Sequence, residues 1–416
     1  MKSPLEMWTL DVIRALRFQG SDGQALQSLA QSDSTRLLDA ADGAHITLPL
    51  AVQCRNLFPA QAQHRLDASL AANAQCHTKV VAAYREIAEE FARADVRFLV
   101  LKGLAQWPWY VDDLRHRSQS DIDIYCPAES LEAARAALGL LGYHPVHSNR
   151  PQPMDHLPVM IRKTGWTWRG DYFDPERPPS VELHFRFWDE ETEGFSVGDV
   201  NRFWRQRVRR DIGGVQIPTL NLTDGLKYSA MHMIRHLLRG DLQLRHVYEL
   251  AHFLERSAGN DAFWQEWERS SPPQHRLVEA IAFRLAREWF APHLHPAACQ
   301  LIEQLPTPVH RWFQLFGMSL ATALSRPNKD ELWLHLCLVE NPSVRRRIAI
   351  RRLFPVSRQR VALDPHLNTN PSVTLSIRRS LYAARFLAFR VIHHCRTFLP
   401  VLRSGLRWWK ARAATS

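Results

Sequence analysis

The chain of 416 residues is longer than one hydrophobic core usually supports, so two or three packed units are expected. Its 45% hydrophobic and 23% charged residues exclude a protein that is disordered throughout. The net charge of +11 is uneven: residues 343–416 hold sixteen Lys and Arg but one acidic residue, Asp364, so the rest of the chain is mildly acidic.

The periodicity of the apolar residues changes along the first third of the chain from helical to strand-like spacing. Residues 1–95 predict helices, because apolar residues recur there at helical spacing. Residues 96–101 (VRFLVL) are a short apolar run typical of a buried strand, and 104–114 predict a short helix interrupted near Pro108. Residues 121–125 (DIDIY) alternate with period two, which predicts a strand with both aspartates on one face.

The remaining elements suggest how the chain is divided. Residues 129–141 predict a helix that ends at Gly142, residues 181–187 (VELHFRF) predict another alternating strand, and helical spacing returns from Thr223. We expect an α+β protein with a small mixed β-sheet as its core. The expected parts are a helical region over 1–95, the core over 96–220, a helical domain over 221–342 and a basic tail over 343–416.

Residues 99–146 hold the pattern that indicates chemistry. Gly103 removes a side chain where backbone N–H groups can approach an anion, and Lys102 adds a point charge suited to a phosphate. Asp121 and Asp123, spaced by two on a strand, present two carboxylates on one face. This arrangement suits two Mg²⁺ ions that assist in-line displacement at phosphorus.

A two-metal site usually needs a third carboxylate, and Glu182 on the next predicted strand is the first choice. Asp174 and Glu176 are rivals, but they lie in a proline-containing loop and would be held less rigidly. His184 shares a face with Glu182, so it would orient the carboxylate or contact the substrate.

These motifs resemble those of the uncharacterised nucleotidyltransferases, within the superfamily of the DNA polymerase β kind. The matching residues are Leu101, Lys102, Gly103, Arg117, Asp121, Ile122, Asp123, Leu141, Gly142, Tyr143, Glu182, Leu183 and His184. The likeness covers residues 75–260 well and the rest loosely. The Lys-Gly turn departs from the Gly-Ser turn that is standard in the superfamily.

The resemblance implies a palm-like nucleotidyltransferase core and chemistry with Mg²⁺ and a nucleoside triphosphate (NTP). Asp121, Asp123 and Glu182 would hold two Mg²⁺ ions, while Lys102, Gly103 and Arg239 would hold the triphosphate. Arg117 would neutralise the triphosphate or brace Asp121 through a salt bridge. The acceptor stays open, and the rival function is a catalytically inactive nucleotide- or RNA-binding regulatory protein with the same fold.

His232 and His236 lie at i and i+4 on a predicted helix. This spacing can bind zinc, but no third ligand follows at a suitable spacing in the sequence. Two other interpretations are therefore preferred to zinc binding: a basic helix face that closes over the triphosphate, or a helix face that is packed or solvated.

The basic tail has three alternative roles. Arg378, Arg385, Arg396, Arg403, Arg407 and Lys410 fall in a narrow arc if residues 376–409 form one helix, although Pro400 is expected to interrupt it. Such a helix could lie on an anionic membrane surface, grip RNA phosphates, or pack on the body with its arginines in water.

The sequence predicts a cytoplasmic protein, with peripheral membrane association as one role of the tail. Its six cysteines are scattered without a C-x-x-C pair, which suits a reducing compartment. Asp11 and Arg14 interrupt the apolar stretch that a signal peptide needs, and no run of about 18 apolar residues occurs.

Overall fold

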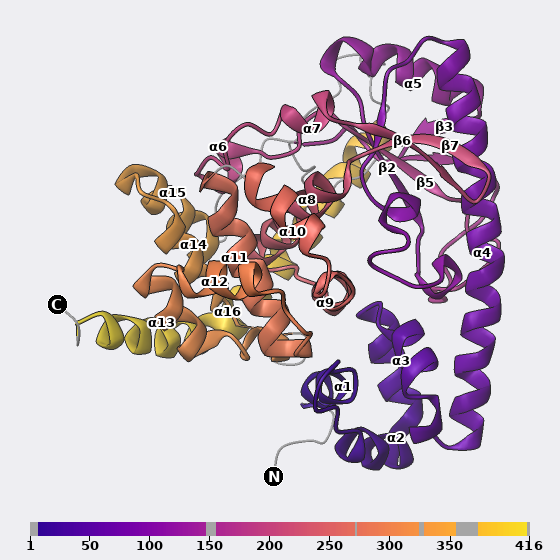
Figure 1. Cartoon of the computed structure of the whole chain (residues 1–416). Helices are drawn as coiled ribbons and strands as arrows, with labels where there is room; N and C mark the ends of the chain where they lie inside the picture. Colours follow the sequence, from indigo (N-terminus) through magenta and orange to yellow (C-terminus); the bar gives the residue numbers. More distant parts are fainter. Residues whose placement is uncertain (1–6, 147–154, 271–272, 324–327, 355–372, 414–416) are drawn as a thin grey trace.

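A computed structural model describes residues 7–146, 155–270, 273–323, 328–354 and 373–413 (Figure 1). It has the predicted α+β fold, in which a mixed sheet lies between helical regions that precede and follow it in the chain.

The sheet has seven strands in the order β3-β4-β5-β2-β1-β7-β6. Their bounds are β1 Leu99–Val100, β2 Asp121–Tyr125, β3 Tyr143–Pro145, β4 Met160–Arg162, β5 Ser180–His184, β6 Val208–Ile212 and β7 Val215–Thr219. Strand β2 pairs parallel to β5 and antiparallel to β1, and β1 pairs parallel to β7. The three strands predicted from the sequence are therefore neighbours at the centre of the sheet.

The N-terminal helices are α1 Trp8–Ala15, α2 Gln24–Gly43, α3 Thr47–Gln53 and α4 Ala60–Arg93. The long helix α4 runs along the sheet, while α1, α2 and α3 gather beside its N-terminal half (Figure 1). Helix α5 (Leu131–Leu140) joins the C-terminal half of α4 on the same face of the sheet, and both contribute to one hydrophobic core with Ile122 and Ile124 of β2.

The C-terminal part of the described chain is helical, as predicted. Its helices are α8 Leu222–Arg239, α9 Leu244–Ser257, α10 Asp261–Ser270, α11 Pro273–Phe290, α12 Pro296–Glu303, α13 Thr307–Phe316, α14 Glu331–Leu338, α15 Pro342–Leu353 and α16 Val373–Ala413. Two short helices, α6 Glu190–Glu193 and α7 Arg202–Arg205, lie earlier, between β5 and β6. A second, larger core joins α7 through α14 and Trp408 of α16 to α1, α2 and α3, while Ile348 of α15 packs in a small separate cluster with Leu332 and Val339. The two ends of the chain thus share one hydrophobic interior.

Alternation along β2 decides which side chains face which core. Ile122 and Ile124 point toward α4 and α5, so the aspartates and Tyr125 lie on the opposite face. Tyr125 belongs to the core shared with the C-terminal helices. Asp121 and Asp123 consequently face the side of the sheet where α8 and α9 pack.

The connection between β1 and β2 differs from the prediction. Residues 104–114 form no α-helix; two short 3₁₀ turns, Gly103–Gln106 and Leu114–His116, flank the Trp107–Pro108 segment. The residue before a proline is disfavoured in helical conformation, which explains why the helix does not form. The predicted strand 96–101 is also shorter, with only Leu99 and Val100 in the ladder.

Helix α16 runs without a break from Val373 to Ala413 and contains Pro400, so the predicted interruption is wrong. A proline inside a helix costs about 3 kcal/mol. Thr397, Ser404 and Trp408 on either side of Pro400 are buried against the body, which offsets that cost. Across the described residues, every helix is too short or too polar to cross a lipid bilayer.

Candidate active site

The acidic side chains come together because β2 and β5 are adjacent parallel strands. In the register of this pair, Asp123 lies opposite Glu182 and Tyr125 lies opposite His184. The strand that carries Glu182 therefore lies directly beside the strand of the two aspartates. Parallel pairing in this register puts Asp123, Glu182 and His184 on one face of the sheet.

Asp123 is the centre of a buried polar cluster. Its Oδ1 atom lies 2.9 Å from Lys102 Nζ and 3.1 Å from His184 Nε2. Glu182 Oε2 lies 3.7 Å from His184 Nε2 and 3.8 Å from His156 Nε2. The potential ligand atoms of Asp123, Glu182 and His184 are all within 4.8 Å of one another, so this trio could hold a cation. Asp121 is outside this trio.

The electrostatics of the cluster separate the two aspartates. Burial disfavours the charged form of Asp123, but Lys102 and a hydrogen bond from His184 outweigh burial and lower the pKa of Asp123. Burial raises the pKa of Asp121, and repulsion from Asp123 raises it further. Asp123 is thus held as a carboxylate, whereas Asp121 lacks a direct counter-ion of this kind and has more to gain from a cation.

The same acids favour the charged form of His184. Burial disfavours the imidazolium, but hydrogen bonds to Asp123 and Glu182 raise its pKa above the ordinary value. Asp155 Oδ2 lies 3.9 Å from His184 Nδ1 and is itself paired with Arg235 of α8. His184 is only 1% exposed, which favours the orienting role over contact with a substrate.

Lys102 and Gly103 form the predicted turn after β1. Gly103 has φ of +70°, and a Cβ atom there would lie 2.0 Å from Gln119 Nε2. The Gly103 N–H donates to Gln106 Oε1 at 3.2 Å, so a phosphate would have to replace that contact. Burial lowers and the neighbouring acids raise the pKa of Lys102, with a net rise to about 12, and the side chain therefore stays charged.

A pocket opens beside Asp121 and Asp123. We call it the acid pocket; its walls include Lys102, Gly103, Arg117, Asp121, Asp123, His232, Arg245 and His246. Positive side chains thus enter it from the β1–β2 connection and from α9. Glu182 borders Asp123 and is not among the residues that line the pocket.

Two predicted arginines have partners that the sequence did not indicate. Arg117 lines the acid pocket but pairs with Glu249 of α9, at 2.9 Å between Nε and Oε1, and not with Asp121. Arg239, near the C-terminus of α8, pairs with Glu193 at 2.6 Å and does not line the pocket. Its predicted contact with a triphosphate therefore stays a prediction without geometric support. Arg245 of α9, and not Arg239, lines the acid pocket.

The rival acids Asp174 and Glu176 lie elsewhere. Asp174 accepts a hydrogen bond from Trp166 Nε1 at 2.7 Å, and Glu176 pairs with Lys79 on α4. Both line a different pocket beside α4. The loop position that made them weaker choices in the sequence also carries them away from Asp123.

Sequence reasoning missed several residues of the site. Asp155 and His156 come from the proline-rich segment before β4, where no periodic pattern marks them. Arg245, His246 and Glu249 lie at the start of α9, and their spacing on one helical face was the signal available.

The chain belongs to the family described as uncharacterised nucleotidyltransferase, whose sequence profile matches residues 30–291, more than half of its length. This membership supports a nucleotidyltransferase-like function. No curated protein and no solved structure matches the chain significantly.

Proposed function

We propose that this protein transfers a nucleoside monophosphate from an NTP to an acceptor, with Mg²⁺ bound by Asp121, Asp123 and Glu182. The observation that carries the proposal is the register of β2 and β5, which places Asp123 directly opposite Glu182 beside a pocket lined by cations. Paired carboxylates next to positive side chains suit a substrate that combines a triphosphate with a divalent cation.

The residues present fit such a cation. Carboxylate oxygens are the ligands that Mg²⁺ prefers, and Asp123, Glu182 and the pocket-facing Asp121 supply them. When bound, Mg²⁺ would neutralise phosphate charge and polarise the phosphorus–oxygen bonds. Lys102, which is paired with Asp123, can exchange this carboxylate for a phosphate oxygen.

The reaction needs positioning and charge more than covalent chemistry from the protein. An acceptor oxygen attacks the α-phosphorus, a new oxygen–phosphorus bond forms, and the bond to the β-phosphate breaks to release pyrophosphate. Glu182 receives the acceptor proton. Arg117 and Arg245 stabilise the negative charge of the triphosphate from the pocket wall.

Incubation with each α-³²P-labelled NTP and Mg²⁺, with and without total RNA and cell lysate, tests this function. Transfer by the wild type is expected to fall by about 10²-fold or more in Asp123→Asn and Glu182→Gln, as when a group that stabilises a transition state is removed. Glu176→Gln is the matched control, because Glu176 is an exposed acid of the neighbouring loop. NTP binding without transfer by the wild type would instead support the inactive regulatory rival.

We further propose that α16 lies on an anionic membrane surface. At about 100° per residue, its exposed apolar side chains fall within an arc of roughly 140°. They are Leu387, Val391, Ile392, Phe398, Leu399, Leu402, Leu406 and Trp409. The buried Thr397, Ser404 and Trp408 lie on a separate face that packs on the body.

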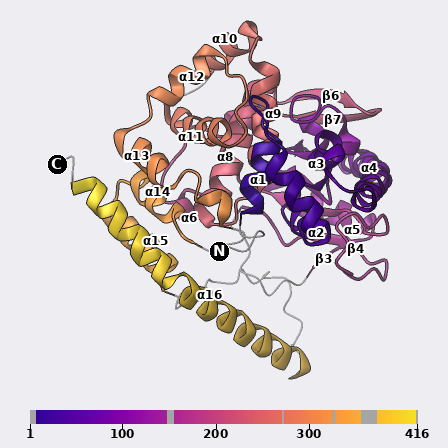
Figure 2. The same cartoon turned by 90° about the horizontal axis from the view of Figure 1, so that it is seen from below.

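Basic residues border the apolar arc of α16. Arg396, Arg403, Arg407 and Lys410 lie along one edge of it, while the side chains of Arg378 and Arg385 are outside the described residues. Figure 2 shows α16 as a long helix at the margin of the molecule. An apolar face with a cationic border suits insertion among anionic headgroups better than it suits binding to RNA phosphates, which would leave the apolar side chains in water.

Co-sedimentation with phosphatidylcholine vesicles, with and without phosphatidylserine, tests the membrane proposal. The triple variant Leu399→Gln/Leu402→Gln/Leu406→Gln is expected to bind anionic vesicles at least about tenfold more weakly. Leu140→Gln is the control, since Leu140 is an exposed leucine on α5. Salt-sensitive RNA binding in place of vesicle binding would contradict the proposal.

A further inference from the structure

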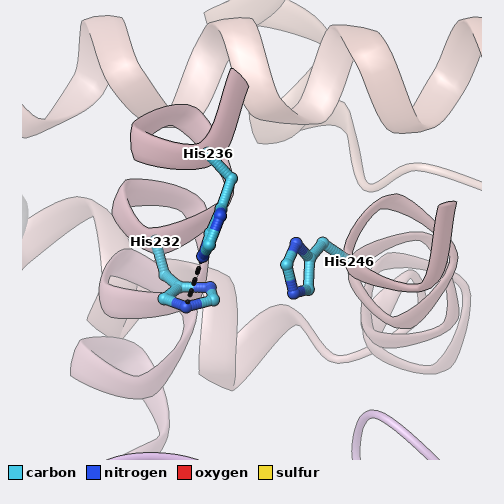
Figure 3. A group of neighbouring side chains, drawn as sticks. All are labelled: His232, His236 and His246. Carbon is cyan, nitrogen blue, oxygen red and sulfur yellow. Dashed lines mark hydrogen bonds between the residues drawn. The ribbon is translucent and has the colours of Figure 1, made fainter. Parts of the chain in front are cut away.

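Three histidines converge where α8 meets α9. His232 and His236 are one turn apart on α8, and His246 faces them from α9 (Figure 3). One ring nitrogen of each lies within 4.8 Å of the others. No third ligand follows His236 at a suitable spacing in the sequence, and the fold supplies one from the next helix.

The connection between the helices explains the convergence. Helix α8 ends at Arg239 and is followed by Gly240, which has φ of +78°, and α9 begins at Leu244. This short left-handed turn folds α9 back beside α8, so that the third residue of α9 meets the last turns of α8. Asp241 in the turn lies 3.1 Å from His236 Nδ1 and can orient that ring.

The nitrogen positions suit a small metal ion. His232 Nε2 and His236 Nε2 are 3.1 Å apart. Two nitrogens bound to one tetrahedral Zn²⁺ at about 2.0–2.1 Å would lie roughly 3.3–3.4 Å apart. A shift of a few tenths of an ångström would bring this pair to the spacing of metal ligands, and His246 lies within 4.8 Å of both.

The three rings are prepared for metal binding by their surroundings. Burial lowers the pKa of each imidazole, and nearby Lys102 and Arg235 add to the effect at His232. Neutral imidazoles keep a lone pair free for a metal at neutral pH. The buried His246 Nδ1 has no hydrogen-bond partner, an unfavourable condition that a rearranged, metal-bound cluster can relieve.

We propose that His232, His236 and His246 bind one Zn²⁺ ion, separate from any Mg²⁺ at Asp123 and Glu182. Three imidazoles without a thiolate or carboxylate in the set favour Zn²⁺ over Mg²⁺ or Ca²⁺. Three protein ligands leave a fourth position for water or a substrate atom, as in zinc sites that take part in reactions.

The site would change the wall of the acid pocket. His232 and His246 both line that pocket, so a bound Zn²⁺ adds positive charge on the side opposite the sheet. Lys102 Nζ lies 3.1 Å from His232 Nε2 and would give up this contact, while its ion pair with Asp123 keeps it in place. The ion would also link α8 to α9 near the bound substrate.

The test uses full-length, tag-free protein stripped with a chelator and titrated with Zn²⁺ alone against a chromophoric competitor. One Zn²⁺ per chain is expected at the histidines, with affinity at least about 100-fold lower in His236→Gln and in His246→Gln. His252→Gln, which removes another histidine of α9, is the matched control. Asp123→Asn/Glu182→Gln is expected to keep the tight Zn²⁺ site.

Zn²⁺ lost from Asp123→Asn/Glu182→Gln but kept in the histidine variants would overturn the proposal. If the variants do not fold, X-ray absorption at the zinc edge of the wild type identifies the ligands of the bound Zn²⁺. Three imidazole nitrogens at about 2.0 Å are expected. A shell of oxygens with one imidazole would place Zn²⁺ at Asp123, Glu182 and His184 instead. These readouts do not depend on nucleotidyl transfer.

Discussion

Two ion pairs hold buried charged side chains where the helices meet the sheet. Arg117 and Glu249, both less than 10% exposed in their side chains, neutralise each other at the pocket wall. Lys102 does the same for Asp123. Removing one member of such a pair leaves a buried charge, so substitutions there affect folding as well as activity.

Glu279 on α11 is a buried acid outside the candidate site. Burial raises its pKa to about 7, although Trp267 Nε1 donates to its Oε1 at 2.7 Å. The folded protein therefore binds this proton more tightly than the unfolded chain does. The resulting stability is fully present below about pH 4.5, and it is lost as the pH rises to about 7.

Glu279→Gln is expected to remove this pH dependence. The variant should exceed the wild type in free energy of unfolding by up to roughly 3 kcal/mol at pH 8, and the difference should vanish toward pH 4.5. Urea denaturation at both pH values measures it. Glu266→Gln, at an exposed acid of α10, serves as the control. An equal difference at both pH values would argue against the shifted pKa.

At the scale of elements, the connection from β1 to β2 depends on one residue. Gly103 adopts a left-handed backbone conformation and lies under Gln119, whose Nε2 donates to the Asp121 carbonyl at 3.0 Å. Gln119 thus connects the Lys102–Gly103 turn, where phosphate binding is predicted, to the strand that carries Asp121.

Gly103→Ala is expected to lower the free energy of unfolding by about 1–3 kcal/mol, because the left-handed conformation is strained for alanine and Gln119 must move. It should also reduce any transfer activity. Gly139→Ala, inside α5 with open space around it, should instead raise stability by up to about 1 kcal/mol. Thermal denaturation measures the stability of both variants. Similar changes in the two would contradict a specific need for glycine at position 103.

At the scale of the whole molecule, the N-terminal helices share one hydrophobic core with the C-terminal helices. Trp8 of α1 belongs to the same buried cluster as Trp264 and Trp289. The Phe18 N–H donates to the Phe290 carbonyl at 2.9 Å, and Arg17 Nε donates to the Trp289 carbonyl at 3.2 Å. These contacts tie the N-terminal region to the end of α11.

Trp8→Ala is expected to cost about 3–5 kcal/mol of unfolding free energy, because a large side chain leaves a cavity in the shared core. Protease cleavage within α11 should accelerate in parallel. Trp409→Ala, at an exposed tryptophan, should change stability by less than about 0.5 kcal/mol. Unchanged cleavage of α11 in Trp8→Ala would mean that the two regions unfold independently.

Local patterns were enough to predict the central strands and the family. Alternation over 121–125 and 181–187 placed Asp121, Asp123, Glu182 and His184, because period two is a property of a strand by itself. The short strands β3, β4, β6 and β7 were missed. The Gly213-Gly214 turn between β6 and β7 was a hairpin signal that the sequence did contain.

The sequence by itself determined the α+β class, the acidic strands and the basic charge of the C-terminal segment, because composition and residue spacing are local properties. The tertiary structure alone decided that Arg117 pairs with Glu249, that Arg245 enters the acid pocket and that His246 meets His232 and His236. Such contacts depend on how separate elements pack, and no local spacing specifies that.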